Sequence, residues 1–160
     1  MLRASPTPVE AGTLNGVDRP FELAVNLSTV FSALGFVERL DAARAAGFDA
    51  VEMRWPTAAE RGDRTLAELA DDVASRGMHV ALLNFPAGDM AGGDRGLAGD
   101  PERAGEFRDL IEDALRFAAA MGCAKLTALA GNRRNGYGEE AHRRVLIDSL
   151  AQAAEAAAAR

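Results

Sequence analysis

Two stretches decide the fold: residues 43–52, "ARAAGFDAVE", and residues 118–127, "AAAMGCAKLT". In each, alanine-rich helical sequence passes through one glycine, Gly47 or Gly122, directly into a short apolar strand. Glycine is common just after a last helical turn because it readily adopts a left-handed backbone conformation. The repetition of this helix-to-strand joint indicates that the chain is built from repeated units.

The same alternation of strand and helix continues outward in both directions from these joints. The apolar spacing predicts strands at 21–27, 48–53, 78–83 and 124–129, and helices at 28–46, 65–76, 100–121 and 139–160. Thr65 and Glu68 have the spacing of a capping box, and Asp100 is a candidate N-cap. Four strand–helix units in strict alternation predict a parallel sheet with right-handed crossovers.

Two α/β architectures use such units, a (β/α)8 barrel and a small open doubly wound parallel sheet. A complete barrel needs about 250 residues, so four units in a domain at 21–160 predict half a TIM barrel. Residues 1–20 are rich in Pro, Gly, Thr and Ser, and we expect them to be a disordered leader.

Composition narrows the classes of partner and compartment. The net charge is −6 and no basic block is present, so a nucleic-acid partner is not expected. No apolar run approaches the roughly 20 residues of a membrane span, so we expect no membrane partner. The single cysteine, Cys123, excludes an internal disulfide and favours a reducing, cytoplasmic setting.

In both architectures ligands bind at the carboxyl ends of the strands, and polar residues follow each predicted strand. Asn26 and Asn84 suit either a turn or a binding site. Glu52 favours function, because an unpaired carboxylate on a buried strand is costly. Arg133 and Arg134 are typical of solvated loop charges, although either suits an acidic substrate.

The histidines and aromatic residues near the strands carry weaker signals. His79 lies at the start of its strand, which favours a structural role, and His142 is predicted to be exposed on the last helix. Trp55 and Phe85 flank strand ends, where they suit either a pocket wall or the core.

A long glycine-rich loop, 86–99, joins the third predicted strand to the next helix. It lacks the lysine of a P-loop and the dinucleotide-binding pattern. Asp89 and Asp94 are not spaced as in a calcium loop. The remaining readings are a lid over the strand ends, based at Asp89, or a disordered insertion.

Three motifs resemble the N-terminal half of hydroxypyruvate isomerases. They are "FELAVNLSTVF" at 21–31, the pattern N-x-PAGD-x-x-x-G-x-x-G at 84–96, and Ala130–Gly131 after the fourth strand. This family and the related 2-oxo-tetronate isomerases are xylose-isomerase-like (β/α)8 barrels. The resemblance implies a sugar-acid aldose–ketose isomerase, which shifts a proton between adjacent carbons of a small hydroxy-carbonyl acid.

The resemblance also implies a divalent metal, Mg or Mn, and two glutamates that transfer the proton. In the family these groups lie on strands five to eight, so no residue of this chain is assigned as a metal ligand or as catalytic. We therefore expect the chain alone to be inactive or nearly so. The substrate wall carried over is Asn26, Glu52, Asn84, Asp89 and Gly131, and Arg133 is added because it suits an acidic substrate.

Arg54 stands where the resemblance leads us to expect an apolar or aromatic residue. Apurinic endonucleases of the same superfamily would place histidines at strand ends, and this sequence has none there. Two alternatives remain open. One is a non-catalytic half-barrel that pairs with another chain or forms a homodimer through open sheet edges. The other is an independent doubly wound domain that binds a small anion near Arg133.

Overall fold

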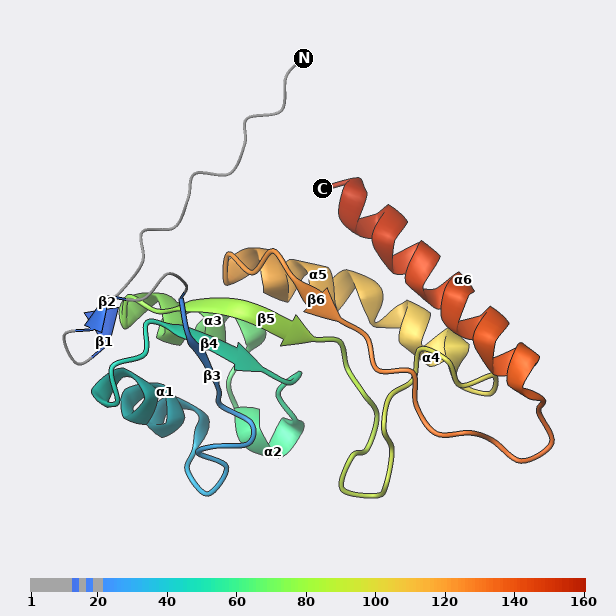
Figure 1. Ribbon diagram of the computed structural model, residues 1–160, viewed down its shortest axis with the longest axis horizontal. Coiled ribbons are helices and arrows are strands. Elements are labelled where there is room, and N and C mark those ends of the chain that lie inside the picture. Colours follow the sequence, from blue (N-terminus) through green and yellow to red (C-terminus); the bar gives the residue numbers. More distant parts are fainter. Residues whose placement is uncertain (1–12, 15–16, 19–21) are drawn as a thin grey trace, which may run out of the picture.

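The computed structural model describes residues 13–14, 17–18 and 22–160. Its centre is a four-stranded parallel sheet in the order β3-β4-β5-β6 (Figure 1). The strands are β3 (Ala24–Asn26), β4 (Ala50–Met53), β5 (His79–Asn84) and β6 (Leu126–Thr127). The helices are α1 (Phe36–Ala45), α2 (Ala58–Arg61), α3 (Leu66–Ser75), α4 (Ala104–Asp109), α5 (Ile111–Ala120) and α6 (Glu139–Ala158).

The strand order distinguishes the two predicted architectures. Each strand pairs with its neighbour in the chain, and the order does not reverse anywhere in the sheet. A doubly wound sheet contains such a reversal, whereas a barrel adds its strands in sequence. The prediction of part of a TIM barrel is therefore confirmed.

One face of the sheet is covered by helices. Val25, Val51 and Val80 pack into one core with the apolar sides of α1, α3 and α5. The helix residues of this core include Leu40, Leu69, Ala70, Val73, Phe117 and Ala118. The Thr65–Glu68 capping box predicted for α3 is present, and Leu69, Ala70 and Val73 are its buried residues.

A second core lies beyond the carboxyl ends of the strands. Phe85 and Leu97 meet Phe107 of α4 and Ile111 of α5, with Ala153 of α6 on the far side. Figure 1 shows α6 leaning beside α4, away from the sheet. The end of the long loop is thus part of the hydrophobic core.

The opposite face of the sheet carries a row of side chains that belong to neither core. Asn26 pairs with Glu52, and Glu52 with Leu82, in adjacent strands. The register shifts between Val51 and Glu52, so that Ala81 is the extra residue of a bulge. In a barrel this face points toward the axis.

Several predicted boundaries were wrong, for local reasons. Helix α1 starts at Phe36 rather than at residue 28, because the chain first turns back on the carbonyl oxygen of Asn26. The helix predicted at 100–121 starts at Ala104 and is divided at Leu110. Asp100 therefore caps a turn, accepting a hydrogen bond from the backbone N–H of Glu102 at 3.1 Å.

The leader predicted at 1–20 lies largely outside the described residues and stays a prediction. Within it, β1 (Thr13–Leu14) and β2 (Val17–Asp18) form a short antiparallel pair. Across the described part of the chain, no helix has both the length and the apolar character needed to cross a membrane.

Candidate functional site

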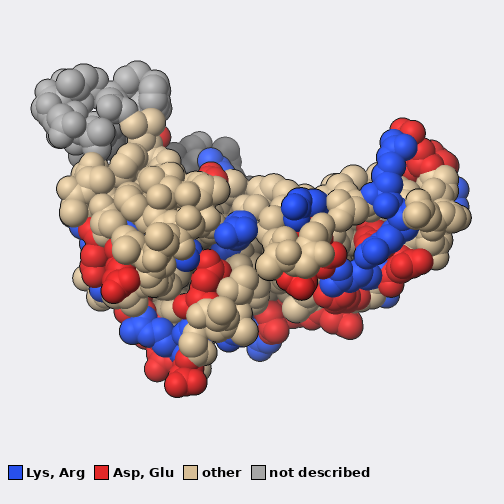
Figure 2. Space-filling model, turned by 90° about the horizontal axis from the view of Figure 1, so that it is seen from below, with Lys and Arg blue, Asp and Glu red and all other residues tan. Residues whose placement is uncertain are grey.

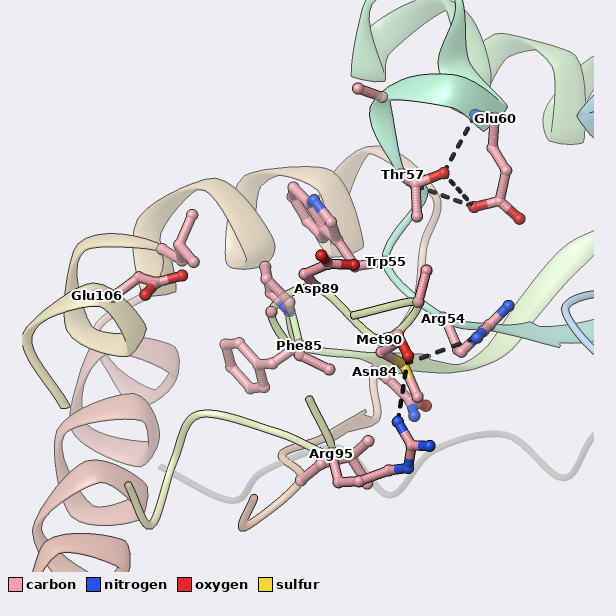
Figure 3. A pocket seen from close by; sticks show the side chains of 17 residues that line it. Arg54, Trp55, Thr57, Glu60, Asn84, Phe85, Asp89, Met90, Arg95 and Glu106 are labelled. Atoms are coloured by element: carbon pink, nitrogen blue, oxygen red, sulfur yellow. Dashed lines mark hydrogen bonds between the residues drawn. The ribbon is translucent and has the colours of Figure 1, made fainter. Parts of the chain in front are cut away.

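A pocket of about 990 Å³ opens at the carboxyl ends of β4 and β5 (Figure 3). Its wall combines residues that follow β4, the end of β5, the first half of the long loop, α2 and the end of α4. The lining residues used below are Arg54, Trp55, Glu60, Asn84, Phe85, Asp89, Met90, Arg95 and Glu106. This is the position at which barrel enzymes bind their substrates.

Two aromatic residues give the pocket its apolar wall. Trp55 lies edge-on to Phe117 of α5, with 5.5 Å between ring centroids. Phe85 lies against Phe107 of α4 at 5.3 Å and is buried. Each ring has one side in the core and the other toward the pocket, so both roles considered from the sequence are present.

Asn84, the last residue of β5, places its side-chain amide at the pocket. Among the described residues, its side chain has no hydrogen-bond partner. It pairs in the sheet with Thr127 and is half-buried. An amide in this position can both donate to and accept from a bound oxygen.

Asn26 and Glu52 lie on the neighbouring strand ends and bond to each other rather than lining the pocket. The Asn26 Nδ2 donates to Glu52 Oε1, while its Oδ1 accepts from the backbone N–H of Ser28 at 2.9 Å. Asn26 thus forms a turn and also holds the carboxylate in place. This pairing offsets the cost of placing Glu52 on a half-buried strand.

The loop 86–99 has two parts with different roles. Its stem is buried and bridges Gly96 to Ala130, and the N–H groups of Ala98 and Gly99 donate to the carbonyls of Leu129 and Ala130 at 3.2 and 2.7 Å. Its tip, residues 88–95, projects from the molecule (Figure 1). The loop is therefore not a disordered insertion, because its second half is built into the fold.

Asp94, rather than Asp89, anchors the base of the tip. The Asp94 Oδ2 accepts from the backbone N–H of Asp89 at 2.7 Å and from Arg103, beside the start of α4. The hydrogen bond from Arg103 holds the pKa of Asp94 below its ordinary value. Asp89 is exposed in the tip and accepts from the backbone N–H of Gly92 at 2.9 Å.

Gly131 and Arg133 do not present side chains to the pocket. Gly131 has a positive φ of 98° and lies directly against Gly96. The side chain of Arg133 is 77% exposed, and its Nη2 lies 3.2 Å from Glu139 Oε2. Gly131 therefore acts through its backbone, and the structure does not place Arg133 in the site.

The neighbouring Arg134 pairs with a buried acid. Its Nη2 lies 2.7 Å from Oδ2 of Asp100, whose side chain is only 2% exposed. Burial raises the pKa of Asp100, but hydrogen bonds from Arg134 and from the Glu102 N–H outweigh it and leave the pKa lowered. This ion pair joins the end of the loop stem to the segment that follows β6.

The expectation that His142 is exposed was wrong. The ring is half-buried, with Nδ1 2.9 Å from the carbonyl oxygen of Gly99, and Nε2 accepts from the backbone N–H of Arg134 at 3.2 Å. Both contacts join the ring to backbone groups outside its own helix, and helical periodicity does not reveal such contacts. His79 lies at the start of β5, 3.2 Å from Glu22, far along the strand from the pocket.

The residues present do not by themselves form a metal centre. Over the described ranges, no group of three or more His, Cys, Asp or Glu side chains is arranged to hold an ion. Glu52 is instead bonded to an amide. The Mg or Mn expected from the resemblance stays a prediction, and no step is assigned to it.

Arg95 was not predicted as a site residue and Arg54 was predicted without a role, although both line the pocket. The Arg54 Nη1 faces the sulfur of Met90 at 3.7 Å, and the Arg95 Nη1 donates to the carbonyl oxygen of Met90 at 3.2 Å. The only sequence signal for Arg95 is a basic residue inside a glycine-rich loop.

Residues 40–160, which include both decisive joints, match the family of xylose isomerase-like TIM barrels. The chain belongs to this family. As a member of the xylose isomerase-like TIM barrels, it is 37% identical over 131 residues to the hydroxypyruvate isomerase of Escherichia coli (strain K12), covering 82% of this chain and 49% of that protein.

Two further relatives are also named as isomerases and match a similar share of the chain. A putative hydroxypyruvate isomerase of Streptomyces coelicolor is 40% identical over 136 residues, and the match covers 83% of this chain and 49% of that protein. The 2-oxo-tetronate isomerase of Cupriavidus necator is 37% identical over 136 residues, covering 85% and 50%. The chain spans about half the length of the curated relatives it matches, and it corresponds to their N-terminal part.

Solved structures share the fold over about half of their length. The AP endonuclease, family 2, from Brucella melitensis matches with a TM-score of 0.74 and 34% identity, over 86% of this chain and 51% of that one. A D-allulose 3-epimerase from Methylomonas sp. matches with a TM-score of 0.58 at 19% identity, over 85% and 47%. The latter likeness concerns the fold alone.

Proposed function

We propose that the chain forms one half of the substrate site of a hydroxypyruvate-isomerase-type enzyme. The reaction is a 1,2-proton shift on a small hydroxy-carbonyl acid. One observation carries the proposal: Asn84 and the loop 86–99 enclose a pocket at the strand ends, in a chain 37–40% identical to proteins named as such isomerases.

Each part of the pocket has a task in this proposal. Trp55 and Phe85 exclude water from one side, which strengthens polar contacts inside. The free amide of Asn84 binds a hydroxyl or carbonyl oxygen of the substrate. Glu52, held by Asn26, contributes an oriented carboxylate to the barrel side of the sheet.

Proton transfer is assigned to groups that the described residues do not supply. Three carboxylates among the described residues line the pocket with Asn84. Glu60 is committed to a capping box and to Arg39 at 2.7 Å, Glu106 lies 2.7 Å from Arg103, and Asp89 is exposed in the loop tip. We therefore propose that the chain alone binds substrate without turning it over. Mg or Mn would have to be held by ligands beyond this set.

The test measures binding and turnover separately. Saturation-transfer NMR should detect hydroxypyruvate bound to the folded chain, and ¹³C NMR with Mg²⁺ or Mn²⁺ should show no aldehyde isomer above background. Asn84→Ala should weaken binding, while the exposed Asn135→Ala should not. If the folded chain fails to bind hydroxypyruvate, the pocket is not the substrate site. Turnover by the chain alone would refute the proposal that the proton-transfer groups lie outside the described residues.

The name of the Brucella structure does not lead us to propose a nuclease. The ends of β3, β4 and β5 carry the amides and the carboxylate of Asn26, Glu52 and Asn84. The two histidines are held elsewhere, by Glu22 and by the Gly99 carbonyl. The overall charge of −6 also opposes a phosphate backbone.

A second candidate is self-association. β3 and β6 are the edges of the described sheet, and Ile147 and Leu150 of α6 are 49% and 44% exposed. Exposed edges and apolar side chains favour an interface, and we propose a second copy of the chain as the occupant. Sedimentation equilibrium should show a dimer that an Ile147→Glu, Leu150→Glu variant disrupts, and a wild-type monomer at all concentrations would refute it.

We further propose a reducing, cytoplasmic setting. Support comes from the single cysteine, Cys123, which is buried with its sulfur 3.2 Å from the carbonyl oxygen of Lys125. Fractionation of cells that produce the tagged protein is the test, and recovery in an oxidising compartment would contradict the proposal.

A further inference from the structure

Two arginines enter the pocket without a carboxylate partner. Arg54 extends from the end of β4 and Arg95 from the loop tip, and Figure 3 shows both reaching Met90, close to the amide of Asn84. Among the described residues, neither guanidinium lies within salt-bridge distance of an acid. By contrast, Arg39 and Arg76 lie 2.7 Å from Glu60 and Asp41.

The contacts of these arginines fix their positions and leave donors free. The backbone N–H of Arg54 donates to Ser28 Oγ at 3.0 Å, and its Nη2 to the Ser28 carbonyl oxygen at 3.4 Å. The Arg95 Nη1 donates to the carbonyls of Met90 and Asp94 at 3.2 and 2.6 Å. A guanidinium has five N–H donors, so most remain available to a ligand.

The charge balance makes this arrangement informative. The chain carries 24 acidic and 18 basic residues, so acids are in excess and basic groups readily find partners. On the side where the loop tip projects, a few basic groups lie in the middle of the surface with acidic groups beside them, and charges of both signs gather toward both ends of the molecule (Figure 2). Two unpaired guanidiniums beside one pocket repel each other, and a bound anion relieves that repulsion.

We propose that Arg54 and Arg95 jointly bind the carboxylate of the substrate, with Asn84 bonding its carbonyl or hydroxyl oxygen. Planar guanidiniums suit a carboxylate because two parallel N–H groups can meet its two oxygens. The pair would make the pocket select small hydroxy-carbonyl acids over neutral sugars. This assignment rests on the proposed function and adds the residues that determine its specificity.

The test compares two ligands that differ in one group. Hydroxypyruvate and dihydroxyacetone share a hydroxyketone, but a hydroxymethyl group replaces the carboxylate in the second. Trp55, the only tryptophan, lines the pocket and reports binding by fluorescence, with calorimetry as the second measurement. The wild-type chain should bind hydroxypyruvate at least about tenfold more tightly, the effect of one charge-assisted hydrogen bond or more.

Variants then assign the selectivity. Arg54→Gln and Arg95→Gln should each weaken hydroxypyruvate binding about tenfold or more and leave dihydroxyacetone binding unchanged. Arg133→Gln is the matched control, because its side chain is 77% exposed and pairs with Glu139, and it should change neither affinity. Arg54→Lys and Arg95→Lys keep the charge without the planar fork and should give intermediate values.

The outcomes separate this assignment from the proposed function. If both glutamine variants retain the preference for hydroxypyruvate, the arginine assignment is overturned while the pocket stands. If the folded wild-type chain binds neither ligand, both proposals fail. Should a variant not fold, competition on the wild type decides: acetate must displace hydroxypyruvate but not dihydroxyacetone, and failure to displace hydroxypyruvate overturns the assignment.

Discussion

The backbones of Gly96 and Gly131 approach so closely that neither residue can carry a side chain. A Cβ on Gly131 would lie 2.5 Å from the carbonyl oxygen of Gly96, and one on Gly96 would lie 2.2 Å from that of Leu129. Both residues also have positive φ, 125° and 98°. Gly96 is the last glycine of the loop motif at 84–96, and Gly131 lies 35 positions further along the chain. The two motifs thus form the two sides of one β-bridge.

The first prediction tests this contact by stability. Gly96→Ala should lower the free energy of unfolding by about 2–4 kcal/mol, because it combines backbone strain with overpacking. Gly105→Ala is the control, since no atom lies within 4 Å of the added Cβ and the position is helical. Urea denaturation should show the control unchanged or slightly stabilised, and equal midpoints for Gly96→Ala and wild type would contradict the contact.

The second prediction concerns the buried ion pair of Asp100 and Arg134. Asp100→Asn should destabilise the fold by roughly 2 kcal/mol at pH 7, because it leaves the guanidinium with only Glu102, at 3.9 Å, as a charged partner. Arg134 is 34% exposed, and water therefore compensates part of the loss. Asp113→Asn, in the exposed pair with Arg116, should cost about 0.5 kcal/mol or less.

The pH dependence of this pair has a definite sign. The pKa of Asp100 is lowered in the folded state, so the pair stabilises the protein above the unfolded pKa of about 4. That stabilisation disappears as the pH falls through the folded-state pKa. The gap in unfolding free energy between wild type and Asp100→Asn should therefore be constant from pH 5 upward and close at lower pH. A gap that stays constant from pH 5 down to pH 2 would show that the charge is not its cause.

The third prediction uses the two histidines as a matched pair. His142→Ala should speed hydrogen exchange at the amide of Arg134 and loosen the loop stem at Gly99, because it removes both ring contacts. His79→Ala, at the opposite end of β5, should leave these amides protected. Exchange measured by NMR decides, and equal protection in both variants would refute the bridging role of His142.

The fourth prediction separates the two aspartates of the loop. Asp94→Ala should increase hydrogen exchange throughout 88–95, because it frees the tip from both Asp89 and Arg103. Asp89→Ala should affect only the turn at Gly92. If Asp89→Ala loosens the tip as much as Asp94→Ala, the anchor has been assigned to the wrong residue.

The features predicted from the sequence are those that local patterns determine. Gly47 and Gly122 end helices with positive φ, and Thr65 caps α3 through Glu68. Short-range hydrogen bonding determines each of these helix ends. The alternation of strands and helices, and from it the parallel sheet, could therefore be predicted. The same capping pattern at Thr57 and Glu60 indicates the start of α2, which was not predicted.

The features that were missed depend on residues far apart in the chain. Arg95 reaches the pocket only because the loop stem is fixed against Leu129 and Ala130. Arg133 looks equivalent to Arg134 in sequence, yet one faces solvent and the other a buried acid. Adjacent residues in a loop point in different directions, and no periodicity reveals which one turns inward.

The stem of the long loop closes on itself before the tip begins. The N–H of Gly96 donates to the carbonyl oxygen of Ala87 at 3.2 Å. Beyond this contact the tip bonds within 88–95 and to three side chains outside it, those of Arg103, Asn132 and Arg54. The sequence of those eight positions can therefore be exchanged while the stem that holds them stays fixed. Grafting tips from other barrels between Ala87 and Gly96 should redirect ligand choice and leave the scaffold intact.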